Sequence, residues 1–175
     1  MLETKINDTN IRLEQGDLTA MEIESIVHYA SPDLNLGSGF GSAIAARGGS
    51  SIQEELKQFG TIETTKSVVT SGGGLNSSYI IHAVGPRFQE EETDQKLAKT
   101  MENALQAAKE KGISRIAFPP MGSGFYGVPL DTCAAIMLST IKKHISNGSS
   151  LKEIVICVID NREYRIFQEE WKSLN

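Results

Sequence analysis

The chain has 175 residues, of which 39% are hydrophobic and 22% are charged, and its formal net charge is −5. This length suits one domain with a core of its own, so we expect residues 1–175 to form a single domain. The acidic balance excludes a broad nucleic-acid-binding surface, because such surfaces neutralise phosphates with Lys and Arg. No apolar run approaches the roughly 18 residues of a membrane span. The N-terminus has no signal-peptide pattern, so we expect no membrane partner.

Short runs rich in β-branched residues predict six strands, and helical patterns separate them. The predicted strands lie around residues 11–13, 25–30, 67–70, 79–84, 115–118 and 153–159. The predicted helices cover residues 43–46, 51–60, 94–112 and 131–148, and a last one from residue 164 onwards. Ser51 and Glu54 form a capping-box pattern, and we expect Asp94 and Asp131 to cap the next two helices.

The alternation of strands and helices indicates a three-layer α/β/α domain with a mixed, mostly parallel central sheet. Ligands bind such sheets at the carboxyl ends of the strands. We therefore expect function to lie in the loops that lead from strands into helices.

Two of those loops are rich in glycine. The first glycine segment, Gly37–Ser42, leads into a helical pattern, and the second, Gly122–Gly127, follows Pro119 and Pro120. Glycines let the backbone approach a ligand closely and turn its N–H groups toward an anion. A helix N-terminus behind such a loop adds a favourable dipole. Two such segments in one sheet predict a phosphate-bearing ligand.

Two familiar phosphate-binding folds do not fit this pattern. The second glycine segment has G-x-G-x-x-G spacing, but it lies late in the chain, and Asp131 is not followed by the strand end that a dinucleotide fold needs. No Gly-Lys-Ser/Thr follows either segment, which makes nucleotide triphosphate hydrolysis improbable. We expect a phosphate ester or diphosphate held mainly by backbone amides.

Asp17 and the three histidines allow more than one interpretation. Asp17 follows the first predicted strand, where it can accept a hydrogen bond from an exocyclic amine or simply cap a turn. His28 is a candidate for chemistry near neutral pH, and a strand histidine with a satisfied hydrogen bond is the alternative. His82 and His144 are expected to be structural.

The two cysteines, Cys133 and Cys157, each lie among apolar neighbours. This placement is typical of buried free thiols, which persist in reducing compartments. We therefore expect an intracellular protein, cytoplasmic or nuclear. Because the cysteines are distant from one another in sequence and no histidine cluster accompanies them, we expect no metal site and no cofactor.

Taken in order, these segments resemble the macro domain family of ADP-ribose-binding modules. The resemblance runs from Gly16 to about Trp171. It rests on the turn Gly16–Thr19, the strand end at Ile26 and Val27, and the two glycine segments. It also includes the runs Tyr79–Pro86 and Ile116–Pro119. The resemblance implies that residues 1–175 are a single macro domain.

The resemblance also implies a role for each part of the site. Asp17, followed by Leu18, would read the adenine amino group, and Ser31 would contact the distal ribose. The two glycine segments would wrap the diphosphate and the distal ribose, with Tyr126 and Phe125 beside that sugar. Ile159, Asp160 and Asn161 would border the adenine. The residues implied in the glycine segments are Gly37, Ser38, Gly39, Phe40, Gly41, Gly122, Ser123, Gly124, Phe125 and Tyr126.

Departures from the family pattern bear on activity. Hydrolytic members carry Val-Asn-Ala-Ala-Asn where this chain reads Val27–Ser31, so Ser31 replaces the asparagine that orients the distal ribose. The best-known hydrolase subgroup has an aspartate where this chain has Gly41. A missing general base costs about 10² to 10⁴ in rate. The resemblance therefore implies binding of ADP-ribose, free or attached to a protein or nucleic acid, with weak or no hydrolysis.

Two other functions remain open. An enzyme could remove ADP-ribose from macromolecules, or the acetyl group from O-acetyl-ADP-ribose, if a substrate phosphate or ordered water replaced the missing groups and Ser31 or His28 assisted. Alternatively, the fold could have turned to another ligand, such as a different nucleotide or RNA. The Asp17 turn and both glycine segments favour ADP-ribose, with or without hydrolysis.

Overall fold

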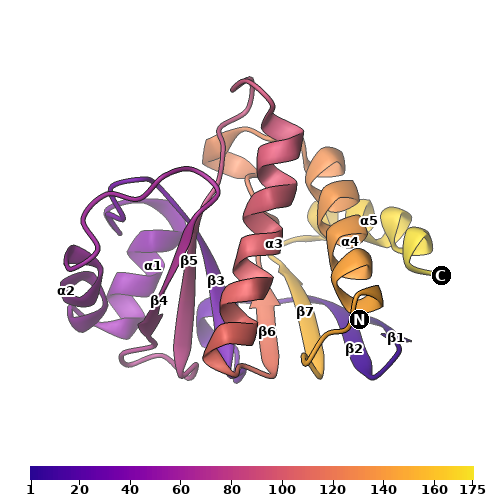
Figure 1. The fold of residues 1–175 in the computed structure, drawn as a ribbon, viewed down its shortest axis with the longest axis horizontal. Helices are drawn as coiled ribbons and strands as arrows, with labels where there is room; N and C mark the ends of the chain where they lie inside the picture. The colour runs from indigo at the N-terminus through magenta and orange to yellow at the C-terminus, as the bar shows by residue number, and fades with distance from the viewer.

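The computed structural model describes residues 1–175 as one seven-stranded sheet with helices on both faces (Figure 1). The strands are β1 (Leu2–Ile6), β2 (Thr9–Gln15), β3 (Ser25–Ala30), β4 (Ser67–Ser71), β5 (Tyr79–Val84), β6 (Arg115–Phe118) and β7 (Glu153–Val158). The α-helices are α1 (Gly39–Gly48), α2 (Ser51–Lys57), α3 (Thr93–Lys111), α4 (Leu130–Ser146) and α5 (Asn161–Glu170). Three 3₁₀ helices are η1 (Leu18–Ala20), η2 (Gly124–Tyr126) and η3 (Trp171–Leu174).

The strand order in the sheet is β1-β2-β7-β6-β3-β5-β4. Pairing is parallel from β2 through β7, β6 and β3 to β5, whereas β1 and β4 run antiparallel along the two edges. The expected mixed, mostly parallel sheet is therefore confirmed. All five parallel strands end at the same edge, the upper one in Figure 1.

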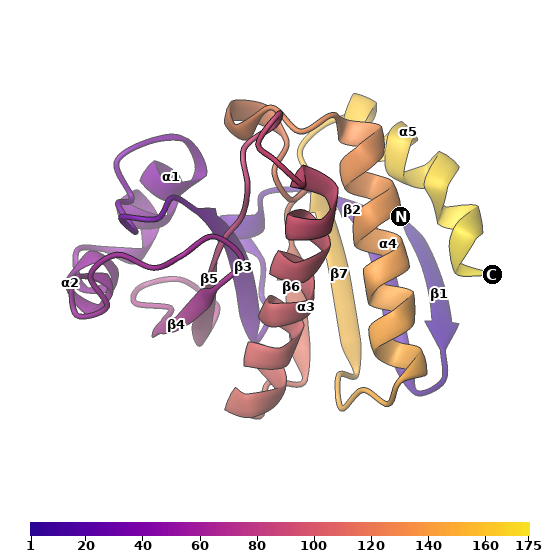
Figure 2. The ribbon, with the colours of Figure 1, turned by 45° about the horizontal axis from the view of Figure 1, so that its top comes forward.

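The two faces of the sheet carry separate apolar cores. Ile26 and Ile80 point to one face, where Ile44 of α1 and Leu56 of α2 cover them. The alternate residues of the same strands point to the other face, beneath α3, α4 and α5. Figures 1 and 2 show α3 and α4 in front of the sheet, with α1 and α2 apart from them. This arrangement confirms the three-layer α/β/α architecture.

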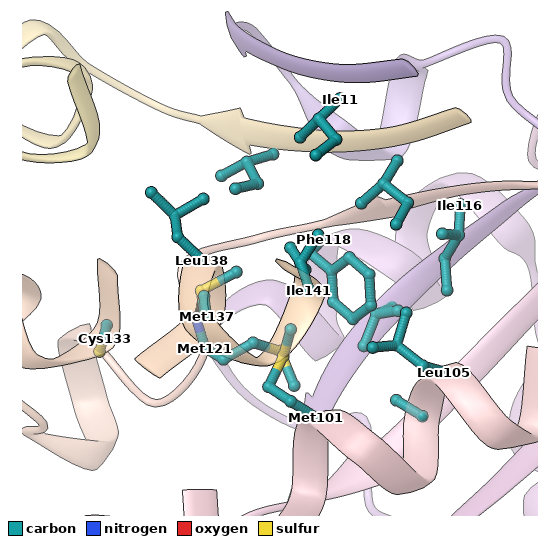
Figure 3. Close-up of a cluster of buried hydrophobic side chains, with 14 of the residues drawn as sticks. Ile11, Met101, Leu105, Ile116, Phe118, Met121, Cys133, Met137, Leu138 and Ile141 are labelled. Carbon is teal, nitrogen blue, oxygen red and sulfur yellow. Dashed lines mark hydrogen bonds between the residues drawn. The ribbon is translucent and has the colours of Figure 1, made fainter. Parts of the chain in front are cut away.

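Methionines anchor the loop after β6 in the larger core. Figure 3 shows Met101, Met121 and Met137 grouped near Phe118. Met121 is fully buried, and its N–H lies 3.3 Å from the Met137 sulfur. Because Met121 directly precedes Gly122, the second glycine segment begins from a fixed point in the core.

Several local expectations need correction. Strand β1 was not predicted, although its alternating burial and the Asn7 turn (φ 52°) that follows it make a hairpin with β2. The expected caps are wrong. Ser51 and Glu54 form no capping box, because the residue that precedes α2 is Ser50 and makes no side-chain bond. Asp94 and Asp131 lie within the first turns of α3 and α4 instead of capping them.

Other features match expectation or exclude a class of structure. Cys133 and Cys157 are buried free thiols, as expected. Phe167 and Trp171 of the last helical segment are buried in the core. None of the helices combines the length and the apolar character that crossing a membrane requires.

One pair of buried polar side chains lies between the sheet and α1. His28 of β3 and His82 of β5 are register neighbours, and their Nδ1 atoms are 3.0 Å apart. The other ring nitrogen of His82, Nε2, lies 2.8 Å from the hydroxyl of Thr70 on β4. Burial lowers the pKa of His28 from 6.5 to about 4, and burial together with its neighbour His28 also lowers the pKa of His82 well below 6.5. Both rings are therefore neutral at pH 7.

This pair makes stability depend on pH. The folded pKa lies below the unfolded value, so the stabilisation is complete above pH 6.5 and is lost as pH falls toward about 4. His28→Asn removes one of these groups. When the pH falls from about 7 to about 5, the unfolding free energy of this variant should therefore decrease by about 2 kcal/mol less than that of wild type. Urea unfolding at the two pH values measures the difference. Equal losses in both proteins would contradict a neutral, buried His28.

Candidate functional site

A cavity of about 1080 Å³ lies at the edge where the five parallel strands end. Its walls come from the last residues of these strands, from the connections that follow them, and from the first turns of α1 and α5. The lining residues are Gly16, Asp17, Leu18, His28, Tyr29, Ser31, Asp33, Asn35, Gly37, Ser38, Gly39, Phe40, Gly41, Arg87, Pro119, Pro120, Gly122, Ser123, Gly124, Phe125, Tyr126, Cys157, Ile159 and Glu163.

The turn after β2 presents a carboxylate to this cavity. Asp17 is the N-cap of η1, and its Oδ1 accepts from the Thr19 N–H at 2.9 Å and the Thr19 hydroxyl at 2.6 Å. Its Oδ2 pairs with Arg47 at 2.9 Å. The hydrogen bonds from Thr19, with Arg47 adding to them, lower the pKa of Asp17, so it is an ionised acceptor. The turn-capping interpretation is therefore confirmed, and the half-exposed carboxylate still lines the cavity.

The loop after β3 is held by short-range hydrogen bonds. Asp33 Oδ1 accepts from the Ser31 hydroxyl at 2.6 Å and from the Asn35 N–H at 3.0 Å. These two bonds lower the pKa of Asp33. Farther along, Gln53 of α2 accepts from the Leu36 N–H at 2.9 Å. The loop therefore reaches the first glycine segment in a fixed path.

The first glycine segment forms the N-terminus of α1. The loop before this helix is shorter than we predicted, because the helix already begins at Gly39. Ser38 makes no side-chain cap bond, and the N–H groups of Gly39, Phe40 and Gly41 have no partner in the protein. Unpaired N–H groups at a helix N-terminus attract anions through hydrogen bonds and the helix dipole.

The second glycine segment offers another row of donors. Gly122 (φ 83°), Gly124 (φ 70°) and Gly127 (φ 77°) have left-handed backbone conformations, which favour glycine. Between them, the N–H groups of Ser123, Gly124, Phe125 and Tyr126 make no hydrogen bond within the protein. The segment closes on itself through a bond from the Val128 N–H to the Gly122 carbonyl at 2.9 Å.

Tyr29 joins the walls on the β5 and β6 sides. Its hydroxyl donates to the Pro86 carbonyl, and its ring fills the space that a Cβ on Gly85 would need. The ring also meets Tyr126 edge to face, with centroids 4.7 Å apart. By contrast, Phe125 is 83% exposed at the cavity mouth.

The wall after β7 differs from expectation. Ile159 lines the cavity and is 74% exposed, but Asp160 and Asn161 do not line it. Asp160 instead caps α5 by accepting from the Glu163 N–H at 2.8 Å, and Asn161 is the first residue of that helix. Glu163 takes their place in the wall, where it accepts from the Ile159 N–H at 2.9 Å.

Neither nucleophilic nor metal chemistry is favoured by the lining. Burial raises the pKa of the Cys157 thiol to about 12, so it is protonated and unreactive at neutral pH. The structure contains no group of three or more His, Cys, Asp or Glu side chains that could hold a metal ion. Arg87 is the one Lys or Arg in the lining. An anion here would meet mostly main-chain donors.

The structure thus brings together most of the residues chosen from the sequence and adds others. One cavity is lined by Asp17, Leu18, His28, Ser31 and Ile159, together with residues 37–41 and 122–126 of the two glycine segments. Sequence reasoning missed nine lining residues: Gly16, Tyr29, Asp33, Asn35, Arg87, Pro119, Pro120, Cys157 and Glu163. Most of them stand within a few residues of a predicted strand end, and this position was the signal that could have found them.

Comparisons with known proteins agree with this fold. The profile of the family described as Macro domain matches residues 27–137. A Fusobacterium nucleatum protein is 38% identical over 167 residues, covering 94% of this chain and 95% of that protein. An Oceanobacillus iheyensis macrodomain with ADP matches with a TM-score of 0.94 and 30% identity, over 99% of this chain and 95% of that one. A Trypanosoma brucei macrodomain in complex with ADP-ribose matches with a TM-score of 0.86 and 26% identity, over 91% and 68% of the two chains. The chain belongs to the macro domain family.

Proposed function

We propose that this protein binds ADP-ribose, free or as a mono-ADP-ribosyl group on a macromolecule, and hydrolyses it weakly or not at all. The observation that carries the proposal is the pair of unpaired N–H rows, at Gly39–Gly41 and Ser123–Tyr126, in the walls of one cavity. A diphosphate supplies many acceptor oxygens and fits such a donor set. The matched macrodomains with ADP and with ADP-ribose support the same ligand class.

The turn after β2 suits the adenine end of the ligand. Asp17 is ionised and can accept a hydrogen bond from the adenine amino group, which is a donor. Ile159 offers an exposed apolar side chain on which the base can pack. Because β2 and β7 are neighbours in the sheet, Asp17 and Ile159 lie on the same side of the cavity.

Binding without efficient turnover is supported by the state of the lining carboxylates. Asp17 already accepts hydrogen bonds from Thr19 and Arg47, and Asp33 accepts them from Ser31 and Asn35. Glu163 accepts from the Ile159 N–H. The lowered pKa values of Asp17 and Asp33 make them weak bases, and efficient general bases titrate nearer the working pH.

Asp17→Ala should abolish the selection of adenine. We expect the variant to bind ADP-ribose more weakly by about 1.5–3 kcal/mol, the usual contribution of a hydrogen bond to a charged group. Inosine diphosphate has an oxygen in place of the amino group, so calorimetry should give wild type a preference for ADP over inosine diphosphate that Asp17→Ala lacks. Arg47→Ala keeps the carboxylate and is the control that retains the preference. An unchanged preference in Asp17→Ala would remove the adenine assignment.

Gly124→Val should place a branched side chain among the donors of the second glycine segment. We expect ADP-ribose binding to weaken by about tenfold or more, because hydrogen bonds to a charged group contribute about 1.5–3 kcal/mol each. Gly112→Val is a matched control. Its φ of 74° resembles the 70° of Gly124, neither Cβ would meet an atom within 4 Å, and Gly112 ends α3 outside the cavity. If both variants bind like wild type in calorimetry, the second segment is not the phosphate cradle.

Hydrolysis is tested with a mono-ADP-ribosylated protein as substrate. We expect the protein to retain this substrate in a pull-down and to release free ADP-ribose at far less than about 1 s⁻¹, the low end of ordinary enzyme turnover. Chromatography of the released nucleotide measures the rate. Multiple turnovers at ordinary enzyme rates would replace the binding proposal with a hydrolase.

A further inference from the structure

One buried side-chain nitrogen of the cavity wall, Nε2 of His28, has no partner in the protein. His28 is 5% exposed, its Nδ1 is engaged with His82, and its Nε2 makes no hydrogen bond. The absence of a side chain at Gly41 keeps this atom accessible, because a Cβ at that position would lie 3.4 Å from Nε2 and cover it. The buried ring therefore presents one free nitrogen beside the N-terminus of α1.

The hydrogen bonds behind His28 decide whether that nitrogen donates or accepts. The Thr70 hydroxyl lies 3.0 Å from the Ser71 carbonyl and 2.8 Å from His82 Nε2; with its hydrogen on the Ser71 carbonyl, its oxygen accepts the proton on His82 Nε2. A neutral His82 then has a bare Nδ1, which accepts from the Nδ1–H of His28. A neutral His28 protonated at Nδ1 has a lone pair at Nε2 and accepts.

The neighbours of this acceptor restrict what can satisfy it. The N–H groups of Gly39, Phe40 and Gly41 are donors and suit ionised phosphate oxygens. A phosphate oxygen cannot satisfy the lone pair of His28, because both atoms are acceptors. The wall therefore fits a ligand with a hydroxyl group close to an anionic group.

The position of β3 in the sheet selects between the two sugars of ADP-ribose. β7 and β6 lie between β2, which carries the Asp17 turn, and β3, which carries His28. A nucleotide whose adenine lies at Asp17 would bring its far sugar, not its adenosine ribose, toward His28.

We infer that His28 Nε2 accepts a hydrogen bond from a hydroxyl of the distal ribose and thereby selects ADP-ribose over ligands that end at the diphosphate. His82 and Thr70 are positioning residues, which fix the acceptor tautomer of His28 without reaching the cavity. This inference rests on the proposed function and names the residue that recognises the distal sugar.

Calorimetry with ADP-ribose and ADP tests the contact. His28→Asn keeps an amide that can donate to His82 and removes the nitrogen at the Nε2 position. We expect its affinity for ADP-ribose to fall about tenfold, the usual effect of one lost hydrogen bond, and its affinity for ADP to stay within about twofold. Equal losses for both ligands, or no loss for either, would overturn the inference. If wild type binds neither ligand, the proposed function itself fails.

Thr70→Val tests the proton arrangement from outside the cavity. Without the threonine oxygen, a proton on His82 Nε2 has no acceptor, so the tautomer of His82 with its proton on Nδ1 becomes more stable. His28 must then accept a hydrogen bond at Nδ1 and carry its own proton at Nε2. We expect the preference for ADP-ribose over ADP to fall as in His28→Asn. Thr100→Val, an equivalent change at a buried threonine that bonds Lys96 on α3, should keep the preference.

Nuclear magnetic resonance provides a reading that does not depend on a variant. Long-range proton–nitrogen correlation of wild type at neutral pH should show His28 protonated at Nδ1 and bare at Nε2, with His82 protonated at Nε2. A His28 ring protonated at Nε2 would overturn the inference even if Thr70→Val failed to fold.

Discussion

Parallel pairing across five neighbouring strands is the constraint on which the rest of this structure depends. Parallel strands carry their carboxyl ends to one edge, so β2, β7, β6, β3 and β5 all deliver their following loops to the same cavity. Helix α1 then starts at that edge, and the unpaired N–H groups of its first residues line the same cavity. Residues as distant in sequence as Asp17 and Ile159 become neighbours for this reason alone.

Strand periodicity and turn residues predicted most of this architecture. Runs such as Tyr79–Val84 and Arg115–Phe118 are bounded by Gly or Pro, and the structure ends them where these residues stand. The edge strand β1 escaped prediction because one face of it is exposed, so its sequence lacks a continuous apolar run. Caps were predicted poorly because several side chains compete for each helix start, and tertiary packing decides which residue comes first.

The cavity was predicted less completely than the fold, for a different reason. Glycine-rich loops indicate places where the backbone can approach a ligand closely, so both glycine segments could be found from the local sequence. The ion pair of Asp17 with Arg47 could not be found in this way, because Arg47 reaches Asp17 from another element. Nor could the His28–His82–Thr70 chain, since its members belong to three strands whose neighbourhood depends on sheet order. Local patterns therefore located the walls, and only the assembled sheet defined how their atoms are paired.

The donor rows at the two glycine segments belong to the main chain, and this has an evolutionary consequence. A substitution can crowd a backbone N–H, but it cannot delete one unless it introduces proline. Chains that share this scaffold can therefore change almost every lining side chain and keep the same main-chain donors for the proposed diphosphate. Natural variation would act instead on the groups around that centre, such as the ring at position 28 or the apolar side chain at position 159. In such a lineage, selectivity for the groups that a ligand carries beside its diphosphate can change quickly, while the main-chain donors proposed to bind the diphosphate are inherited.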